Sequence, residues 1–131
     1  MPATAKEAEP GDRMNDGTVY AGISPDTGKP MYTTPADAPL TYTFNQAQKY
    51  AANVDEHDHQ DWRVPTKNEL NELFNNRAAV GGFNETASGP WGWHWSSSQD
   101  LAGYARGQRF RDGYRENFYK NIDASLRCVR A

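Results

Sequence analysis

The dipeptide Asp112-Gly113, placed between two segments of strand-like composition, constrains the fold of this chain more than any other feature. Asp-Gly is favoured at the centre of the two-residue turns that join antiparallel strands, because such turns need positive φ angles. Segments 104–111 and 114–121, on either side, contain aromatic residues that favour strands. The sequence therefore predicts a β-hairpin formed by these two segments.

A second hairpin is predicted near the N-terminus. Segments 19–24 and 29–34 flank the turn sequence Pro-Asp-Thr-Gly, in which proline presets one backbone angle and glycine tolerates positive φ. Because Pro30 lacks a backbone N–H, the second arm is expected to be an edge strand.

Two further short strands are predicted, at 95–98 and 125–130. In the second of these, Leu126 and Cys128 are expected to face the core, and Arg127 is expected to face away. This alternation is typical of a strand that buries one of its two faces.

Two helices are predicted, each begun by a threonine capping box. In this motif a threonine side chain accepts a hydrogen bond from the backbone three residues later, and a Gln or Glu at that position bonds back. A threonine three residues before Gln46 begins a helix expected over 44–54. A threonine three residues before Glu69 begins a second helix, expected over 67–77. Apolar residues recur at helical spacing in both segments.

The core of such a domain must be largely aromatic. Leu, Ile, Val and Phe contribute only 17 of 131 residues, whereas 16 residues are aromatic and four of these are tryptophan. A chain of this length can bury a core without disulfides or a metal, and Cys128 alone cannot form a disulfide scaffold. We expect one α+β domain over 17–131, with two helices packed on a small, mostly antiparallel sheet. Residues 1–16 are expected to form a polar N-terminal tail or arm.

The sequence argues against several classes of protein. No segment approaches the roughly 18 apolar residues of a membrane-spanning helix, so no membrane insertion is expected. Met1–Pro10 lacks the apolar segment of a signal peptide, so no cleaved leader is expected. The net charge of −3 and the lack of a recognition motif argue against nucleic acid as a partner.

Charge is spread unevenly along the chain. Residues 104–131 carry seven Lys or Arg and three Asp or Glu, whereas residues 1–103 carry seven and 14. This basic C-terminal quarter suits an anionic partner. The alternative is that its arginines simply line the outer face of strands.

Five motifs in a fixed order resemble one protein family. They are Trp62-Arg63-Val64-Pro65-Thr66, Glu69-Leu70, Trp95-Ser96-Ser97-Ser98, Phe110-Arg111-Asp112-Gly113 and Leu126-Arg127-Cys128-Val129-Arg130. This set resembles the bacterial and phage C-type-lectin-like domains of the formylglycine-generating-enzyme branch. It is similar to the C-terminal domain of the Legionella collagen-like adhesin and to the target proteins of diversity-generating retroelements. The resemblance covers about Phe44 to Arg130 and implies a C-type-lectin-like fold.

The resemblance bears on catalysis as well. Enzymes of this fold hold copper with a pair of cysteines, and another branch holds iron with three histidines. In this chain Cys128 stands alone, and two of the three histidines share one loop. We therefore expect no enzyme activity and no cofactor. A metal-dependent enzyme of the formylglycine-generating type is an alternative that the cysteine count disfavours.

The expected function is a non-catalytic recognition module that binds a surface glycan or protein ligand. In the resembling phage and adhesin proteins, the region equivalent to 99–121 presents the ligand surface. Tyr, Arg and Asn are typical of adaptable binding surfaces, and tryptophan faces stack on sugar rings and other flat ligands. The candidate ligand-binding residues are Trp91, His94, Tyr104, Arg106, Arg109, Arg111, Tyr114 and Asn117.

Two simpler interpretations of these residues stay open. The Tyr and Arg side chains could line an ordinary solvent-facing sheet, and the tryptophans could fill a core that is poor in aliphatic residues. Strand alternation would place Trp93 and Trp95 on one face and His94 on the other. We expect Trp95 to be buried, and Trp91 or His94 to be exposed.

The loop 55–61 contains the remaining candidates for metal binding. In an extended segment His57 and His59 would point to the same side, and with a carboxylate they could hold Zn²⁺ or Ni²⁺. The alternative is a solvated loop without a metal.

The resemblance to phage proteins also suggests a location and a second kind of partner. A virion component or a cytoplasmic protein is expected. Because virion subunits often dock through their termini, Met1–Asp16 could contact virion neighbours or a second copy of the chain. A structural decoration or assembly subunit, docked through this arm, is therefore the alternative function.

Overall fold

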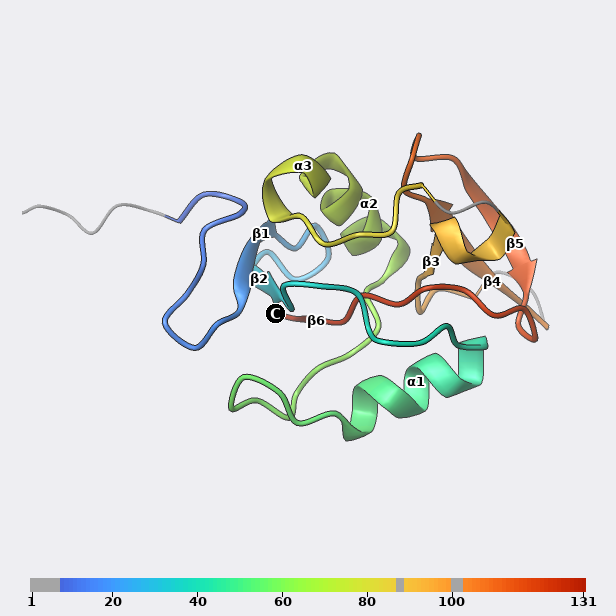
Figure 1. Cartoon of the computed structure of the whole chain (residues 1–131), viewed down its shortest axis with the longest axis horizontal. Helices are drawn as coiled ribbons and strands as arrows, with labels where there is room; N and C mark the ends of the chain where they lie inside the picture. The colour runs from blue at the N-terminus through green and yellow to red at the C-terminus, as the bar shows by residue number, and fades with distance from the viewer. Residues whose placement is uncertain (1–7, 87–88, 100–102) are drawn as a thin grey trace, which may run out of the picture.

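The computed structural model describes residues 8–86, 89–99 and 103–131. Figure 1 shows the chain coloured from its N-terminus to its C-terminus. The elements in chain order are β1 (Val19–Ile23), β2 (Pro30–Thr33), α1 (Phe44–Asn53), α2 (Lys67–Asn75), α3 (Arg77–Val80), the short 3₁₀ helix η1 (Gly89–Gly92), β3 (Trp93–Trp95), β4 (Tyr104–Arg109), β5 (Arg115–Tyr119) and β6 (Val129–Arg130).

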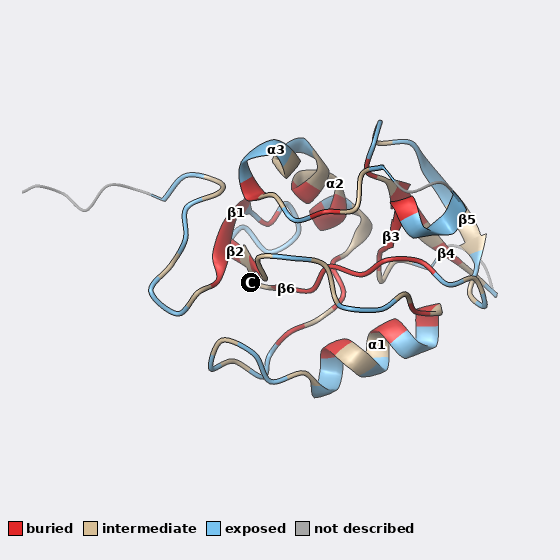
Figure 2. Cartoon of the chain, viewed as in Figure 1, coloured by how far each residue is buried: buried red, intermediate tan, exposed pale blue. Residues whose placement is uncertain are grey.

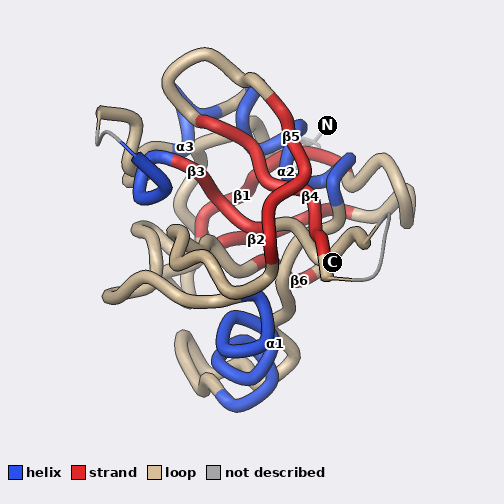
Figure 3. The backbone as a smooth tube through the Cα atoms, turned by 90° about the vertical axis from the view of Figure 1, so that its right-hand side faces the viewer, coloured by secondary structure: helices blue, strands red, loops and turns tan. Residues whose placement is uncertain are grey.

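The strands form two separate three-stranded antiparallel sheets, ordered β1-β2-β6 and β3-β4-β5. Figures 1 and 3 show α2 and α3 on one side of the molecule and α1 on the other. The predicted α+β class is confirmed. The described residues form two small antiparallel sheets where one was expected, because the two hairpins do not pair with each other, and β6 joins the first of them. A further short helix, α3, follows α2.

The capping boxes are present and begin the two predicted helices. The Thr43 side chain accepts from the backbone N–H of Gln46, and the Thr66 side chain accepts from that of Glu69. In both cases the Gln or Glu side chain accepts from the threonine N–H in return. Each hydroxyl thereby satisfies a backbone group that the first turn of a helix leaves without a partner.

Buried side chains form two cores, and Figure 2 shows their positions on the elements. The α1 core consists of Tyr42, Phe44, Ala47, Ala51, Trp62, Val64, Trp93, Trp95, Ala105, Ala124, Leu126 and Cys128. The α2 core consists of Val19, Ala21, Met31, Leu70, Leu73, Val80, Phe83, Phe110 and Val129. Rings fill much of both cores, as the composition predicts.

The predicted C-terminal strand is shorter than expected. Only Val129 and Arg130 pair with β2, while Ser125 forms an isolated bridge to His94. Residues 124–129 are all buried, Arg127 included, so the predicted alternation is wrong. The segment contributes side chains to both cores, and therefore neither of its sides faces solvent.

The prediction of an edge strand at Pro30 is also wrong. Strand β2 lies between β1 and β6. Pro30 is the first residue of β2, and β6 pairs only with Tyr32 and Thr33. The proline therefore lies beyond the end of β6, where its missing N–H removes no ladder hydrogen bond.

Part of the predicted N-terminal arm bonds to its own domain. The N–H of Gly11 donates to the Tyr20 carbonyl at 2.8 Å, and the Tyr20 N–H donates to the Asp12 carbonyl at 2.9 Å. Residues 1–7 of the predicted arm lie outside the described residues. Among the residues that the structure describes, no helix has the length and apolar character needed to cross a membrane.

Candidate ligand-binding surface

The β3-β4-β5 sheet positions most of the candidate residues, and its register divides them between two faces. Trp93 pairs directly with Arg109, and their face packs on α1 through the α1 core. The neighbouring residue Gln108 lies on the opposite face, because side chains alternate along a strand. Its amide nitrogen donates to the Asn71 side chain of α2 at 2.9 Å.

Arg109 is held in a fixed position beside the hairpin turn. Its Nε and Nη2 donate to the two carboxylate oxygens of Asp112 at 2.9 and 2.7 Å. The centre of its guanidinium lies 5.4 Å from the ring centroids of both Trp93 and Tyr114, within cation–π range. We call Trp93, Arg109, Asp112 and Tyr114 the arginine–aromatic cluster.

The electrostatics of this cluster keep the ion pair intact at neutral pH. Hydrogen bonds from Arg109, and then from the backbone N–H of Tyr114, lower the pKa of Asp112 to about 2. The same hydrogen bond raises the pKa of Arg109. The guanidinium is therefore charged and oriented before any ligand arrives.

Large aromatic surfaces are exposed at this end of the molecule. Tyr114 is 54% exposed and Trp91 is 56% exposed. Trp91 lies in η1, which leads directly into β3, and its carbonyl accepts from the Ser125 hydroxyl at 2.6 Å. Arg111 is exposed in the turn between β4 and β5.

Three other candidates lie on the opposite face of the sheet from Arg109. The rings of Tyr104 and Tyr119 are 4.7 Å apart, and the Nε of Arg106 donates to the Asn117 side chain at 3.2 Å. Strand alternation separates these residues from the arginine–aromatic cluster. The eight candidates therefore do not form one continuous surface.

Of the two residues of which one was expected at the surface, Trp91 is exposed and His94 is not, and Trp95 is buried as predicted. His94 is 0% exposed, and its Nε2 lies 2.8 Å from a carboxylate oxygen of Asp37. Its ring packs against that of Phe110 in a tilted arrangement, at 4.3 Å between centroids. Both faces of β3 are covered, because α1 lies against one and the α2 core lies against the other. His94 therefore cannot contact a surface ligand.

Asp37 also binds the buried Arg127. The Nε of Arg127 lies 3.1 Å from Asp37, and its two terminal nitrogens donate to the carbonyls of Thr34 and Gly81 at 2.9 Å. Burial lowers the pKa of Arg127 to about 10, although Asp37 opposes this shift. Hydrogen bonds and charges from His94 and Arg127 outweigh burial and lower the pKa of Asp37. His94 and Arg127 are both 0% exposed, so neither side chain is placed to contact a surface ligand.

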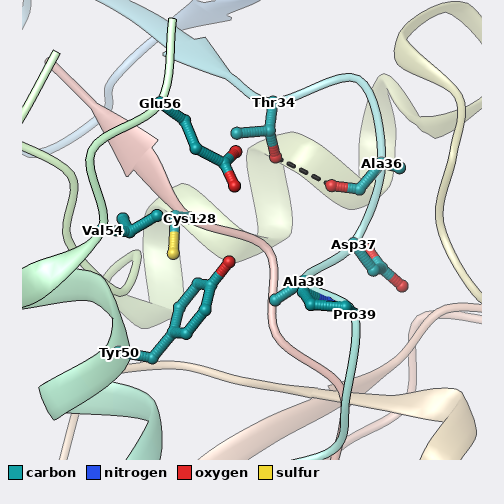
Figure 4. A pocket seen from close by; sticks show the side chains of 9 residues that line it. All are labelled: Thr34, Ala36, Asp37, Ala38, Pro39, Tyr50, Val54, Glu56 and Cys128. Carbon is teal, nitrogen blue, oxygen red and sulfur yellow. Dashed lines mark hydrogen bonds between the residues drawn. The ribbon is translucent and has the colours of Figure 1, made fainter. Parts of the chain in front are cut away.

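A small pocket lies beside α1, and Figure 4 shows its lining. Side chains of Tyr50, Glu56 and Cys128 point into it. Its volume of about 40 Å³ is well below the roughly 300 Å³ of small-molecule pockets. Burial raises the pKa of Cys128 to about 12 and that of Tyr50 to about 12 as well. The thiol therefore stays protonated at neutral pH, and only a thiolate is a good nucleophile or metal ligand.

The metal candidates His57 and His59 do not lie in an extended segment, which is the geometry under which they would point to the same side. His57 and the residue after it have positive φ, and a bridge between Glu56 and His59 closes the turn. The Nδ1 of His57 lies 3.1 Å from the Asp16 carbonyl, and the Nε2 of His59 lies 2.7 Å from the Asp16 carboxylate. No three His, Cys, Asp or Glu side chains within the described ranges are placed to hold a metal together.

Two members of the arginine–aromatic cluster were not among the predicted candidates. The sequence predicts Asp112 only in the turn, and it predicts Trp93 on the same strand face as the buried Trp95. A signal for Asp112 is its place three residues after Arg109, because a tight turn brings such residues side by side. For Trp93 the sequence gives no comparable signal, since its partner strand depends on the register of β3 with β4.

Comparison with known proteins assigns the family. Curated proteins yield no match to this chain. The family model for the Lcl C-terminal domain matches residues 19–130, which include both sheets and all three α-helices of the described structure. This match confirms the resemblance to the C-terminal domain of the Legionella collagen-like protein. The chain therefore belongs to the Lcl C-terminal domain family.

Proposed function

We propose that this domain is a non-catalytic recognition module that captures an anionic ligand, first of all an acidic glycan. The ligand would bind at the arginine–aromatic cluster together with Trp91 and Arg111. One observation carries the proposal. An arginine fixed by a carboxylate and two rings lies beside Tyr114, which is more than half exposed at the end of the hairpin. The helix η1, which carries the exposed Trp91, is joined to this hairpin by the hydrogen bond from the Phe110 N–H to the Gly92 carbonyl.

The charges of the cluster support an anionic ligand. Asp112 balances the charge of Arg109, but no ion pair joins Arg111 to another described residue, and its side chain is exposed. An arginine fork donates to carboxylate or sulfate oxygens in a planar geometry. The exposed rings of Trp91 and Tyr114 would pack against the apolar face of a sugar. An acidic patch on a protein offers the same charges and is the other partner that this surface suits.

Two buried groups favour binding over catalysis. The Cys128 thiol is protonated at neutral pH, and the His94 ring is enclosed and bonded to Asp37. General acid–base or nucleophilic catalysis needs such groups within reach of a substrate. We infer that the domain binds a ligand without transforming it.

A double substitution tests the binding surface. Arg109→Ala with Tyr114→Ala removes the guanidinium and the exposed ring, and we expect it to abolish capture of acidic glycans on a glycan array. Tyr119→Ala is the matched control, because Tyr119 is 59% exposed on the opposite face of the same hairpin. Circular dichroism of the unchanged chain, the double variant and the control reports whether each protein folds. Equal capture by the double variant and the control would show that the ligand binds elsewhere.

We also propose that the protein is a virion component or a cytoplasmic protein and that its N-terminal arm contacts other subunits. A virion component would present this surface to ligands on cells, whereas a cytoplasmic protein would meet ligands inside its own cell. Contacts of Met1–Asp16 with a virion neighbour or a second copy would add to the binding surface by multivalency. Mass photometry of the full chain measures whether copies associate.

A further inference from the structure

The sheet formed by β1, β2 and β6 carries a hollowed surface that the proposed function does not use. Tyr20 pairs with Tyr32, and Tyr32 pairs with Arg130, so these three side chains form a row on one face. The residues that alternate with them belong to the α2 core on the other face. Three adjoining hollows, of about 240, 320 and 280 Å³, all include Tyr32 in their lining.

The lining combines an apolar floor with polar groups at the rim. Tyr20, Pro30 and Ile23 extend the floor around Tyr32. On one side Arg130 donates to the Asp61 carboxylate from Nε and Nη2, at 2.6 and 3.0 Å. Within the described parts of the chain, the Tyr32 hydroxyl has no hydrogen-bond partner. Ligand sites for small molecules combine these features, a concave apolar surface and a few fixed polar groups.

The backbone of this sheet is not available to a ligand strand. On the β1 side, the Tyr20 N–H and carbonyl bond to Asp12 and Gly11. On the β6 side, the Val129 N–H and carbonyl both bond to Arg63. A peptide that binds by adding a strand needs such groups to be free. A ligand must therefore be bound by the side chains of the face itself.

The charges around Tyr32 balance. Lys29 and Arg130 are opposed by Asp61 and Asp16. The hollows therefore give no electrostatic preference to an anion or a cation. The paired guanidinium and carboxylate of Arg130 and Asp61 offer donors next to acceptors, which suits neighbouring hydroxyl groups that both donate and accept. A tyrosine face suits the C–H surface of a sugar ring.

The three hollows that share Tyr32 are together called the Tyr32 hollow. The geometry points to a second ligand site here: we propose that the Tyr32 hollow binds a neutral saccharide. The site is separate from the arginine–aromatic cluster, because it lies on the other sheet and is built from different strands. The Tyr32 ring supports the sugar, and Arg130 with Asp61 orients its hydroxyl groups.

NMR titration of the ¹⁵N-labelled full chain tests this site. The probes are three neutral oligosaccharides: cellotriose, maltotriose and triacetylchitotriose, each added to millimolar concentration. We expect at least one to shift the amide signals of Tyr32 and Arg130. Tyr32→Ala should weaken that binding by about tenfold or more. Tyr119→Ala, the matched exposed tyrosine of the other sheet, should leave it unchanged.

Two further variants keep the test decisive. If Tyr32→Ala fails to fold, Asp61→Ala serves in its place, because the Asp61 side chain is largely exposed and leaves the packing intact. The Arg109→Ala and Tyr114→Ala double variant should still bind the neutral sugar, which separates this site from the proposed function. No shift at Tyr32 and Arg130 with any of the three sugars would overturn the proposal, and so would unchanged binding by Asp61→Ala.

Discussion

At the level of single residues, Arg127 departs furthest from what its sequence position suggests. It is 0% exposed, and each of its three guanidinium nitrogens donates one hydrogen bond, to Asp37, Thr34 or Gly81. The Phe83 ring lies 3.8 Å from its guanidinium. A buried cation is tolerated only when its charge and its donors are satisfied in this way.

We predict that Arg127→Met lowers the free energy of unfolding by about 3–5 kcal/mol, because it leaves Asp37 without its buried cation. Arg130→Met is the control, since it removes a partly exposed ion pair that contributes at most about 1 kcal/mol. Urea denaturation followed by circular dichroism measures both values. Similar losses in the free energy of unfolding for the two variants would contradict the prediction that the buried arginine contributes more to stability than the partly exposed one.

At the level of elements, the N-terminus of α2 joins three segments through one carboxylate. Glu69 is buried and accepts from both terminal nitrogens of Arg63, at 2.5 and 2.7 Å. It also accepts from the Ser24 hydroxyl at 2.6 Å, which ties the helix to the end of the first hairpin strand. The capping box of α2 is therefore a tertiary contact as well as a local one.

Acid should weaken this junction over a defined pH range. Burial raises the pKa of Glu69, but hydrogen bonds from Arg63, Ser24 and Thr66 outweigh it and lower the pKa from 4.5 to about 2. A carboxyl whose pKa falls on folding stabilises the protein fully above its unfolded pKa, and this stability is lost as pH falls toward the folded pKa. We predict that the free energy of unfolding declines between pH 4.5 and about 2.

Other carboxylates, such as Asp37, are also titrated by acid, but they are present in both the unchanged chain and the variant Glu69→Gln. The difference between these two proteins therefore isolates the contribution of Glu69. The variant's free energy of unfolding, measured with urea at each pH, should be lower than that of the unchanged chain at pH 7. The difference between the two proteins should shrink as the pH falls. A difference that stays constant from pH 7 to pH 2 would contradict the assignment.

At the level of the whole molecule, the segment 124–129 unites the two cores. Leu126 and Cys128 belong to the α1 core, whereas Val129 belongs to the α2 core. Loss of packing at this segment removes contacts from both cores at once. The domain should therefore unfold as one cooperative unit.

We predict one common urea midpoint for two probes, tryptophan fluorescence for the α1 core and the methyl NMR signals of Leu70 and Leu73 for the α2 core. Leu126→Ala should lower both midpoints together, with a loss of about 2–5 kcal/mol. Leu40→Ala is the control, because Leu40 is largely exposed. Separate midpoints for the two probes would show that the cores unfold independently.

The arrangement of strands in the whole molecule also explains why the predicted ligand-binding residues do not all lie on one surface. Residue types that suit binding were recognised in the hairpin from their chemistry alone. Which of them share a face depends on strand register, and the register places Arg109 on the side of α1 and Arg106 on the other. His94 shows the same limit, since it lies against Phe83 and Phe110 and bonds to Asp37, which is 57 positions away.

The sequence by itself determined the features that depend on residues a few positions apart. The two threonine capping boxes, the presence of a hairpin on either side of Asp112-Gly113 and the aromatic character of the core all follow from local hydrogen bonds, turn-forming residues or composition. The two-residue turn predicted for this hairpin is wrong, because the Arg109 N–H bonds to the Tyr114 carbonyl and four residues, 110–113, lie between them. Only the tertiary structure decided the burial of Arg127, the central place of β2 and the hollow around Tyr32. These depend on segments that meet from far apart, as Asp37 and Arg127 do across 90 positions, and no local rule encodes which distant segments will pack together.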